Sequence, residues 1–300
     1  MRSPRLLFPS IVVLSLLVLA APARPQQPKP ARRMMALQYR PAPRVQMVFR
    51  ARGPKPQVDL RPQISKLGLA IRDQGNRGTC SVFATTFLIE YHTARTMNQN
   101  NLQFSEEYLN WGKNQANHEN KDGGFFTEII AGYQGYGIVP STEMPYQAAF
   151  HPKHPDTPSK KVIADGKAVT RYPFTFIKDW DNSKGMTAAE LEKAKDALRH
   201  GHPVATGIWW LQNVQTVTVD GVPLLKEYPR SANTGSNPPM FDGHSIDLVG
   251  FHEGSQFPGG GYFIFRNSFG TGFGDDGYGF LSFQYLRDYS NDAISIEKKE

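Results

Sequence analysis

The sequence predicts an α+β protein of two lobes, with helices in its first half and strands in its second. After residue 57, apolar residues recur at helical spacing, whereas from about residue 203 they alternate with polar ones in short runs. Gly, Pro and Asp separate these later runs, as turns between strands require. The two patterns are segregated along the chain, which favours an α+β arrangement. A hydrophobic content of 39% indicates a packed globular protein.

Four segments carry helix signals. Residues 81–97 place apolar side chains on one face. FSEEYLNW begins a second helix, with Ser105 as a candidate N-cap before two acidic residues. GGFFTEIIAGYQGYG, with glycines at both ends, predicts a third. TAAELEKAKDALRHG predicts a fourth, because Thr187 and Glu190 match a capping box and Gly201 follows as a stop.

Four runs predict strands: PVATGIWW, HSIDLVGF, GYFIFRNS and YGFLSF. The tryptophans are scattered along the sequence, and we interpret them as core or surface filler.

Residues 1–23 are typical of an export signal. Arg2 and Arg5 precede an apolar run that ends in the small-x-small sequence APA. We therefore expect an exported protein, periplasmic or secreted, with no stable membrane insertion after the signal is cleaved. Export implies an oxidising compartment, yet the chain has one cysteine, Cys80, which cannot form an internal disulfide.

Residues 24–57 form a basic segment rich in Pro, Gln and Arg, and they contain no acidic residue. We favour a linker, with a short pro-segment lying over an acidic body as the alternative. Of the 34 Lys and Arg residues, 11 precede Val58, whereas all 27 acidic residues follow it, so residues 58–300 carry a net charge of −4. Nucleic-acid binding, which the overall charge of +7 suggests, is therefore excluded for the compact part.

Cys80 is a candidate nucleophile because it stands where a helix begins. Gly75 and Gly78 keep the preceding loop non-helical. The unpaired N–H groups of a first helical turn favour a thiolate, the reactive form of cysteine. The alternative is a buried structural cysteine, which is common in proteins.

A catalytic thiol needs a histidine partner and a residue that orients it. His244 opens a predicted strand, and His252, at the end of that strand, is the weaker choice. Asn267 follows on the next strand and could orient the imidazole, while Phe269 and Phe273 could shield their bond from water.

Four blocks of the sequence, in the family's order, resemble the papain-like cysteine peptidases. The resemblance implies a bacterial member of the family that has no disulfides. The blocks are VDLRPQ, QGNRGTCSVFA, the stretch from FSEEYLNW through DGGFFTEIIAGYQGYGIVPSTEMPY, and the pair DGHSIDLVGF and YFIFRNSFGTGFGDDGYGFLSF. The resemblance implies a helical lobe at about 65–165 and an antiparallel, barrel-like β lobe at about 166–290, with the active-site cleft between them. A tail at 291–300 would follow the domain.

The resemblance also implies roles for single residues. Cys80 would be the nucleophile, His244 the base and Asn267 its orienter. The side chain of Gln74 and the backbone N–H of Cys80 would form the oxyanion hole. Main-chain groups of Gly123 and Gly124 would bind an extended substrate, and Ser245 would line a specificity pocket.

The family resemblance implies a monomer that cleaves peptides or proteins and needs no metal or cofactor. Two alternatives stay open at this stage: a papain-like peptide-binding protein that performs no chemistry, and an acyl transferase that uses the same triad.

The sequence departs from the family pattern in five places. Arg77 occupies a position where relatives have a disulfide cysteine, and Ser81 replaces a tryptophan after the nucleophile. Phe269 and Phe273 replace two more tryptophans. Residues 216–240 are expected to be an inserted loop near the cleft.

Overall fold

A computed structural model describes residues 42–44, 47–153, 155–233 and 238–297. The expected signal at 1–23 lies outside these residues. The helices are α2 (Arg61–Lys66), α3 (Cys80–Met97), α4 (Glu106–Asn117), α5 (Phe126–Tyr136), α6 (Lys160–Ala168), α7 (Ala188–Arg199) and α8 (Phe283–Tyr289). The strands are β1 (Met47–Val48), β2 (Val58–Asp59), β3 (Thr175–Lys178), β4 (Val204–Leu211), β5 (Thr216–Val219), β6 (Val222–Leu225), β7 (Met240–Glu253), β8 (Gly261–Arg266), β9 (Phe273–Gly274), β10 (Tyr278–Ser282) and β11 (Ser290–Ser295).

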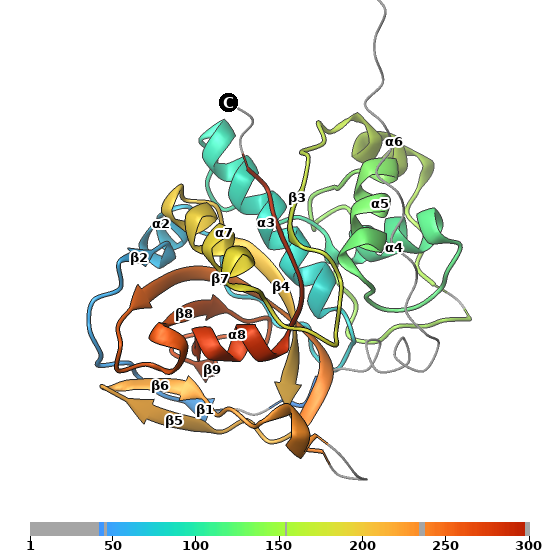
Figure 1. Ribbon diagram of the computed structural model, residues 1–300. Helices are drawn as coiled ribbons and strands as arrows, with labels where there is room; N and C mark the ends of the chain where they lie inside the picture. The colour runs from blue at the N-terminus through green and yellow to red at the C-terminus, as the bar shows by residue number, and fades with distance from the viewer. Residues whose placement is uncertain (1–41, 45–46, 154, 234–237, 298–300) are drawn as a thin grey trace, which may run out of the picture.

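The fold is α+β, as the sequence predicts, with a helical first half and a β-rich second half. Helix α3 runs between helices α4 to α6 on one side and the β lobe on the other (Figure 1). Fourteen of its 18 residues are buried, which explains why α3 is apolar on more than one face. The nucleophile candidate therefore stands at the end of the most enclosed helix described.

The predicted helix caps are present. The side chain of Ser105 accepts a hydrogen bond from the backbone N–H of Tyr108 at the start of α4. Thr187 and Glu190 form the capping box of α7. These caps fix the ends of two helices by local hydrogen bonds, without any contribution from distant residues.

The main sheet has nine strands in the order β3-β11-β4-β7-β8-β10-β6-β5, with β2 also paired to β7. The strand pairs are antiparallel except β10 with β6. β3 and β5 lie at the two ends of the path, so hydrogen bonds among the described strands do not close the sheet into a barrel. The long strand β7 pairs with β4, β8 and β2, which places it at the centre of the β lobe.

Two expectations are corrected by the sheet. The expected inserted loop begins as the hairpin β5–β6, and Val222 and Leu224 of β6 are fully or almost fully buried. The expected tail at 291–300 begins inside β11, whose residues pair with both β3 and β4. β6 is a short apolar run, whereas β11 is mostly polar, but each of the two strands lies between two others in the sheet.

The second half of the basic segment packs on the β lobe. β1 pairs in parallel with β9, and Arg50 contacts Asp275 and Asp276. Ala42 is buried, and Pro43 accepts a hydrogen bond from the indole of Trp210. None of the described helices is long and apolar enough to cross a membrane.

Candidate active site

Cys80 is the first residue of α3 and faces a pocket formed by both lobes. The pocket is lined from the helical lobe by Cys80, Ser81 and residues 124–126, and from the β lobe by residues that include His244 and Ser245. Cys80 Sγ lies 3.8 Å from the carbonyl oxygen of Gly243, to which it can donate weakly. Cys80 is the free cysteine that the sequence predicts, and only 4% of it is exposed.

His244 and Asn267 form the second part of the site. His244 Nε2 lies 2.8 Å from Asn267 Oδ1, and the backbone N–H of Ser268 donates to the same oxygen at 2.8 Å. The amide oxygen thus faces two nitrogens, so Nε2 must carry the proton when the imidazole is neutral. The free electron pair then lies on Nδ1, the nitrogen available to accept a proton.

Nδ1 of His244 is buried and makes no hydrogen bond with any described residue, Cys80 included. The structure therefore brings Cys80, His244 and Asn267 to one site, but the thiol and the imidazole are not hydrogen-bonded to each other. His252 does not belong to this site, because its Nδ1 contacts the carbonyl of Lys55 at the far end of β7.

An aromatic cage surrounds the imidazole. Phe269 stacks on His244 with ring centroids 4.8 Å apart, and Phe273 packs edge-on against Phe269. Trp210 supplies a further wall, 4.6 Å from the imidazole centroid. The interpretation of the tryptophans as core or surface filler is incomplete for Trp210, which is fully buried in the core but also contacts the imidazole. The alternation of β4 predicts only that Trp210 shares a face with Ile208. That this face meets His244 depends on the pairing of β4 with β7, which the sequence does not indicate.

Burial sets the protonation states at this site. It lowers the pKa of His244 to about 4, although the bond to Asn267 acts in the opposite direction. Burial also raises the pKa of the Cys80 thiol, and hydrogen bonds from Ser245 and from the start of α3 offset only part of this effect. The first turn of α3 thus favours the thiolate as expected, but burial outweighs it, and both groups are uncharged at neutral pH.

Gln74 belongs to the loop before Cys80 and is completely buried. Its Nε2 donates to the carbonyl of Arg77 at 2.8 Å, and its Oε1 accepts from the hydroxyl of Ser268 at 2.5 Å. These contacts lock the side-chain amide and leave one N–H of Nε2 for another acceptor. The backbone N–H of Cys80, at the first position of α3, has no acceptor within its own helix.

Gly123 and Gly124 lie in the loop between α4 and α5. The N–H of Gly123 donates to Asn110 Oδ1 at 3.0 Å, and that of Gly124 to the hydroxyl of Ser81 at 3.3 Å. Gly124 and Ser245 line the pocket with Cys80, whereas Gly123 is not one of its lining residues. The contact of Ser81 was not foreseen, because nothing in the local sequence indicates which loop would lie over α3.

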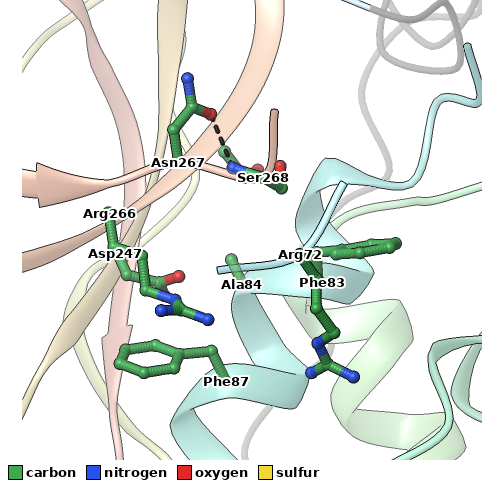
Figure 2. Close-up of a pocket in the computed structure, with 9 residues that line it drawn as sticks. Arg72, Phe83, Ala84, Phe87, Asp247, Arg266, Asn267 and Ser268 are labelled. Atoms are coloured by element: carbon green, nitrogen blue, oxygen red, sulfur yellow. Dashed lines mark hydrogen bonds between the residues drawn. The ribbon is translucent and has the colours of Figure 1, made fainter. Parts of the chain in front are cut away.

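A second pocket lies behind Asn267, between the two lobes. Figure 2 shows Asp247 and Arg266 from the β lobe facing Phe87 and Ala84 of α3. The guanidinium of Arg266 donates to the carbonyls of residues 69 and 70, which lead into the loop before Cys80. Burial raises the pKa of Asp247 well above its usual value, although Arg266 opposes the shift. The hydrogen bonds from Arg266 to residues 69 and 70 are a buried polar contact that joins the two lobes behind the site.

Among the described residues, no group of three or more His, Cys, Asp or Glu side chains could hold a metal ion.

Comparisons with known proteins identify the family. The model of the papain family of cysteine proteases matches residues 55–296. No curated protein matches the sequence.

Several solved structures share the fold. Xylellain, a cysteine protease from Xylella fastidiosa, is 17% identical with a TM-score of 0.62, and the match covers 91% of this chain and 100% of that one. Procathepsin L 3 from the larval midgut of Tenebrio molitor is 20% identical with a TM-score of 0.55, covering 87% and 76%. The proform of the ragweed pollen allergen Amb a 11 is 22% identical with a TM-score of 0.52, covering 84% and 69%. At these identities the likeness bears on the fold alone.

Proposed function

Since this chain belongs to the papain family of cysteine proteases, we propose that it hydrolyses peptide bonds through Cys80, His244 and Asn267. One observation carries the proposal: the bond between His244 and Asn267 leaves Nδ1 of His244 as a free base in a pocket that it shares with Cys80. Peptides or proteins are the substrates that membership of the family implies.

The proposed reaction starts from an uncharged thiol and an uncharged imidazole. Cys80 Sγ attacks the peptide carbonyl carbon while its proton passes to Nδ1 of His244. The N–H groups of Gln74 and Cys80 stabilise the oxyanion. His244 then protonates the amine that leaves, and a thioester remains on Cys80. Water, deprotonated by His244, hydrolyses the thioester and restores the thiol.

A peptide-library cleavage profile tests the proposal. The wild-type protein should cleave peptides, and Cys80→Ala should abolish cleavage. An epoxide or vinyl-sulfone reagent should label Cys80 stoichiometrically in the wild type, and His244→Ala should prevent labelling. Each substitution should reduce the rate by about three orders of magnitude or more, because the members of a triad act as a unit. Absence of labelling between mildly acidic and neutral pH would refute the proposal.

The same experiments separate the two alternatives. Tight peptide binding without turnover by the intact, unlabelled wild type would indicate a binding protein. Product masses after incubation with a peptide and excess amine separate hydrolysis from acyl transfer, since a transferase would yield the new amide.

We also propose that the protein acts outside the cytoplasm, on the basis of its predicted signal. Mass spectrometry of the exported protein should find a mature N-terminus after Ala23. An intact N-terminus on a protein retained in the cytoplasm would contradict export.

A further inference from the structure

The loop before Cys80 and the glycines of the expected substrate wall, Gly123 and Gly124, are in backbone contact. A Cβ atom on Gly123 would lie 2.1 Å from the carbonyl oxygen of Gly78, and Gly123 has a positive φ of 58°. Only glycine permits this approach. The contact sets how far the main chain of Gly123 lies from the nucleophile, so whatever holds it in place also sets the geometry for a bound peptide.

Arg77 directly precedes Gly78 in this loop, and only 4% of the residue is exposed. Its Nε and Nη2 donate to the two carboxylate oxygens of Asp122 at 3.0 and 2.6 Å. Its Nη1 and Nη2 donate to Glu107 at 2.5 and 3.2 Å. Burial alone would lower the pKa of Arg77, but the bonds to Asp122 and Glu107 raise it above its usual value. The cation is therefore permanent and held by two bidentate pairs.

Further contacts occupy the rest of the guanidinium. Nη1 also donates to the carbonyl of Gln147 at 2.9 Å. The rings of Tyr146 and Phe150 lie 4.5 and 5.5 Å from the guanidinium carbon. Because Arg77 is enclosed on these sides, it is not placed to touch a substrate, and any influence on the reaction passes through its partners.

Asp122 connects Arg77 to the substrate wall. It directly precedes Gly123, and its Oδ1 also accepts from Asn110 Nδ2 at 3.2 Å. Asn110 in turn accepts from the N–H of Gly123 at 3.0 Å. The bidentate contact of the Arg77 guanidinium thus fixes the Asp122 carboxylate, which orients the side chain of Asn110. Asn110 in turn holds the backbone N–H of Gly123. The second partner, Glu107, instead accepts from the N–H of Gln147 at 3.1 Å, outside the wall.

We propose that Arg77 is a positioning residue for peptide binding, acting through Asp122 to hold Gly123 and Gly124 at a fixed place beside Cys80. The inference rests on the proposed function, because the glycines bind substrate only if the protein is a peptidase. It assigns the two carboxylates different roles: Asp122 positions the wall, whereas Glu107 mainly compensates the buried charge.

Three variants test this difference. Arg77→Lys keeps the positive charge but cannot make the bidentate contact with a carboxylate. Asp122→Asn keeps the size and shape of the side chain but removes its negative charge. Glu107→Gln is the matched control, because it removes an equally buried carboxylate from the same guanidinium. For each variant, kcat and KM for a peptide substrate and the rate of Cys80 alkylation by iodoacetamide are measured below the thermal midpoint of unfolding.

Arg77→Lys and Asp122→Asn should raise KM about 10-fold or more and change kcat less than about 3-fold. Alkylation of Cys80 should stay within about 2-fold of wild type, because a small reagent does not use the wall. Glu107→Gln should lower the thermal midpoint yet leave KM within about 2-fold. Parallel losses of turnover and alkylation, or an equal rise of KM in Glu107→Gln, would overturn the proposal.

Amide hydrogen exchange separates this inference from the proposed function. If wild-type Cys80 is alkylated but no peptide is cleaved, hydrolysis fails as the function. Faster exchange at residues 121–125 in Arg77→Lys and Asp122→Asn, but not in Glu107→Gln, would still support positioning of the wall. Unchanged exchange there in all three variants would refute it.

Discussion

At the residue scale, His244 shows how burial and one hydrogen bond together prepare a base. The imidazole is 1% exposed, which disfavours its charged form. The bond from Nε2 to Asn267 keeps the proton away from Nδ1. An ordinary histidine is partly protonated below neutral pH, whereas this one stays neutral and able to accept a proton in mildly acidic solution.

The pH dependence of kcat/KM tests this account. The pKa of His244 is lowered to about 4, so Nδ1 remains free as the pH falls from 7 to 5 and becomes protonated near 4. Activity should therefore be retained down to about pH 5 and decline as the pH falls through about 4, since kcat/KM reports the free enzyme. Measurement needs a substrate without titrating groups in this range. A decline centred near 6.5, the ordinary pKa of histidine, would contradict it.

Phe269 carries the second residue-scale prediction. Its ring stacks on the imidazole, and this contact keeps water from the His244–Asn267 bond. Phe269→Leu keeps the apolar volume but loses the ring, so kcat should fall about 2- to 10-fold, the equivalent of about 0.5–1.5 kcal/mol. Phe273→Leu is the control, because Phe273 packs on Phe269 and should change kcat less than about 2-fold. Equal effects of the two substitutions on kcat would show that the stacking of Phe269 on His244 makes no specific contribution to the reaction.

At the scale of elements, the sequence predicted those features that depend on local chemistry. The caps of α4 and α7 were predicted correctly because each cap is a contact within four residues. The residues expected at the site, Cys80, His244 and Asn267, do lie together. The order of the blocks that contain these residues supported the family resemblance. The expected arrangement in three dimensions was inferred from that resemblance.

The elements that the sequence did not predict depend on pairing between distant segments. β6 pairs with β10, more than 50 residues away, and β11 lies between β3 and β4. Likewise, Trp210 reaches His244 only because β4 and β7 are neighbours. Short segments do not indicate which strand they will pair with. The β5–β6 hairpin was therefore predicted as a loop, and the internal strand β11 as part of a tail.

The hairpin β5–β6 can be tested with a matched pair of substitutions. Val222 is fully buried, and Val217 is 49% exposed. Val222→Ala should lower the free energy of unfolding by about 2 kcal/mol, because two buried methyl groups are lost and a cavity remains. Val217→Ala should change it by less than about 0.5 kcal/mol. Denaturant unfolding measures both, and equal small effects would mean that the hairpin is a dispensable surface loop.

At the scale of the whole molecule, charge is distributed unevenly along the chain. The basic segment at 24–57 precedes a body, residues 58–300, that carries a net charge of −4. Arg44 pairs with Asp73 at 2.7 Å, and Arg50 pairs with Asp276 at the same distance. Residues 47–57 also add β1 to β9 and contact the β5–β6 hairpin. The described part of the segment is therefore packed, not a free linker, and whether it restrains activity stays a prediction.

Arg44 is the residue through which the segment can act on the site. Its guanidinium lies 5.2 Å from the centre of the Phe269 ring, and it pairs with Asp73, the neighbour of Gln74. A basic side chain here lies over Phe269, which stacks on His244, and beside the loop that carries Gln74, a residue of the proposed oxyanion hole. Both partners are partly exposed, so the ion pair contributes at most about 1 kcal/mol and weakens with salt.

If the segment restrains access to the site, Arg44→Gln should raise kcat/KM about 2- to 5-fold at low salt, and the difference should vanish near about 0.5 M salt. Arg50→Gln is the matched control, since it breaks an ion pair of the same segment with Asp275 and Asp276 and should leave kcat/KM unchanged. These substitutions are preferable to deleting the segment, because Phe49 packs against Phe273 and its loss would disturb the shield itself. If wild type and Arg44→Gln have the same kcat/KM at every salt concentration, the segment is structural support for the β lobe and does not control access.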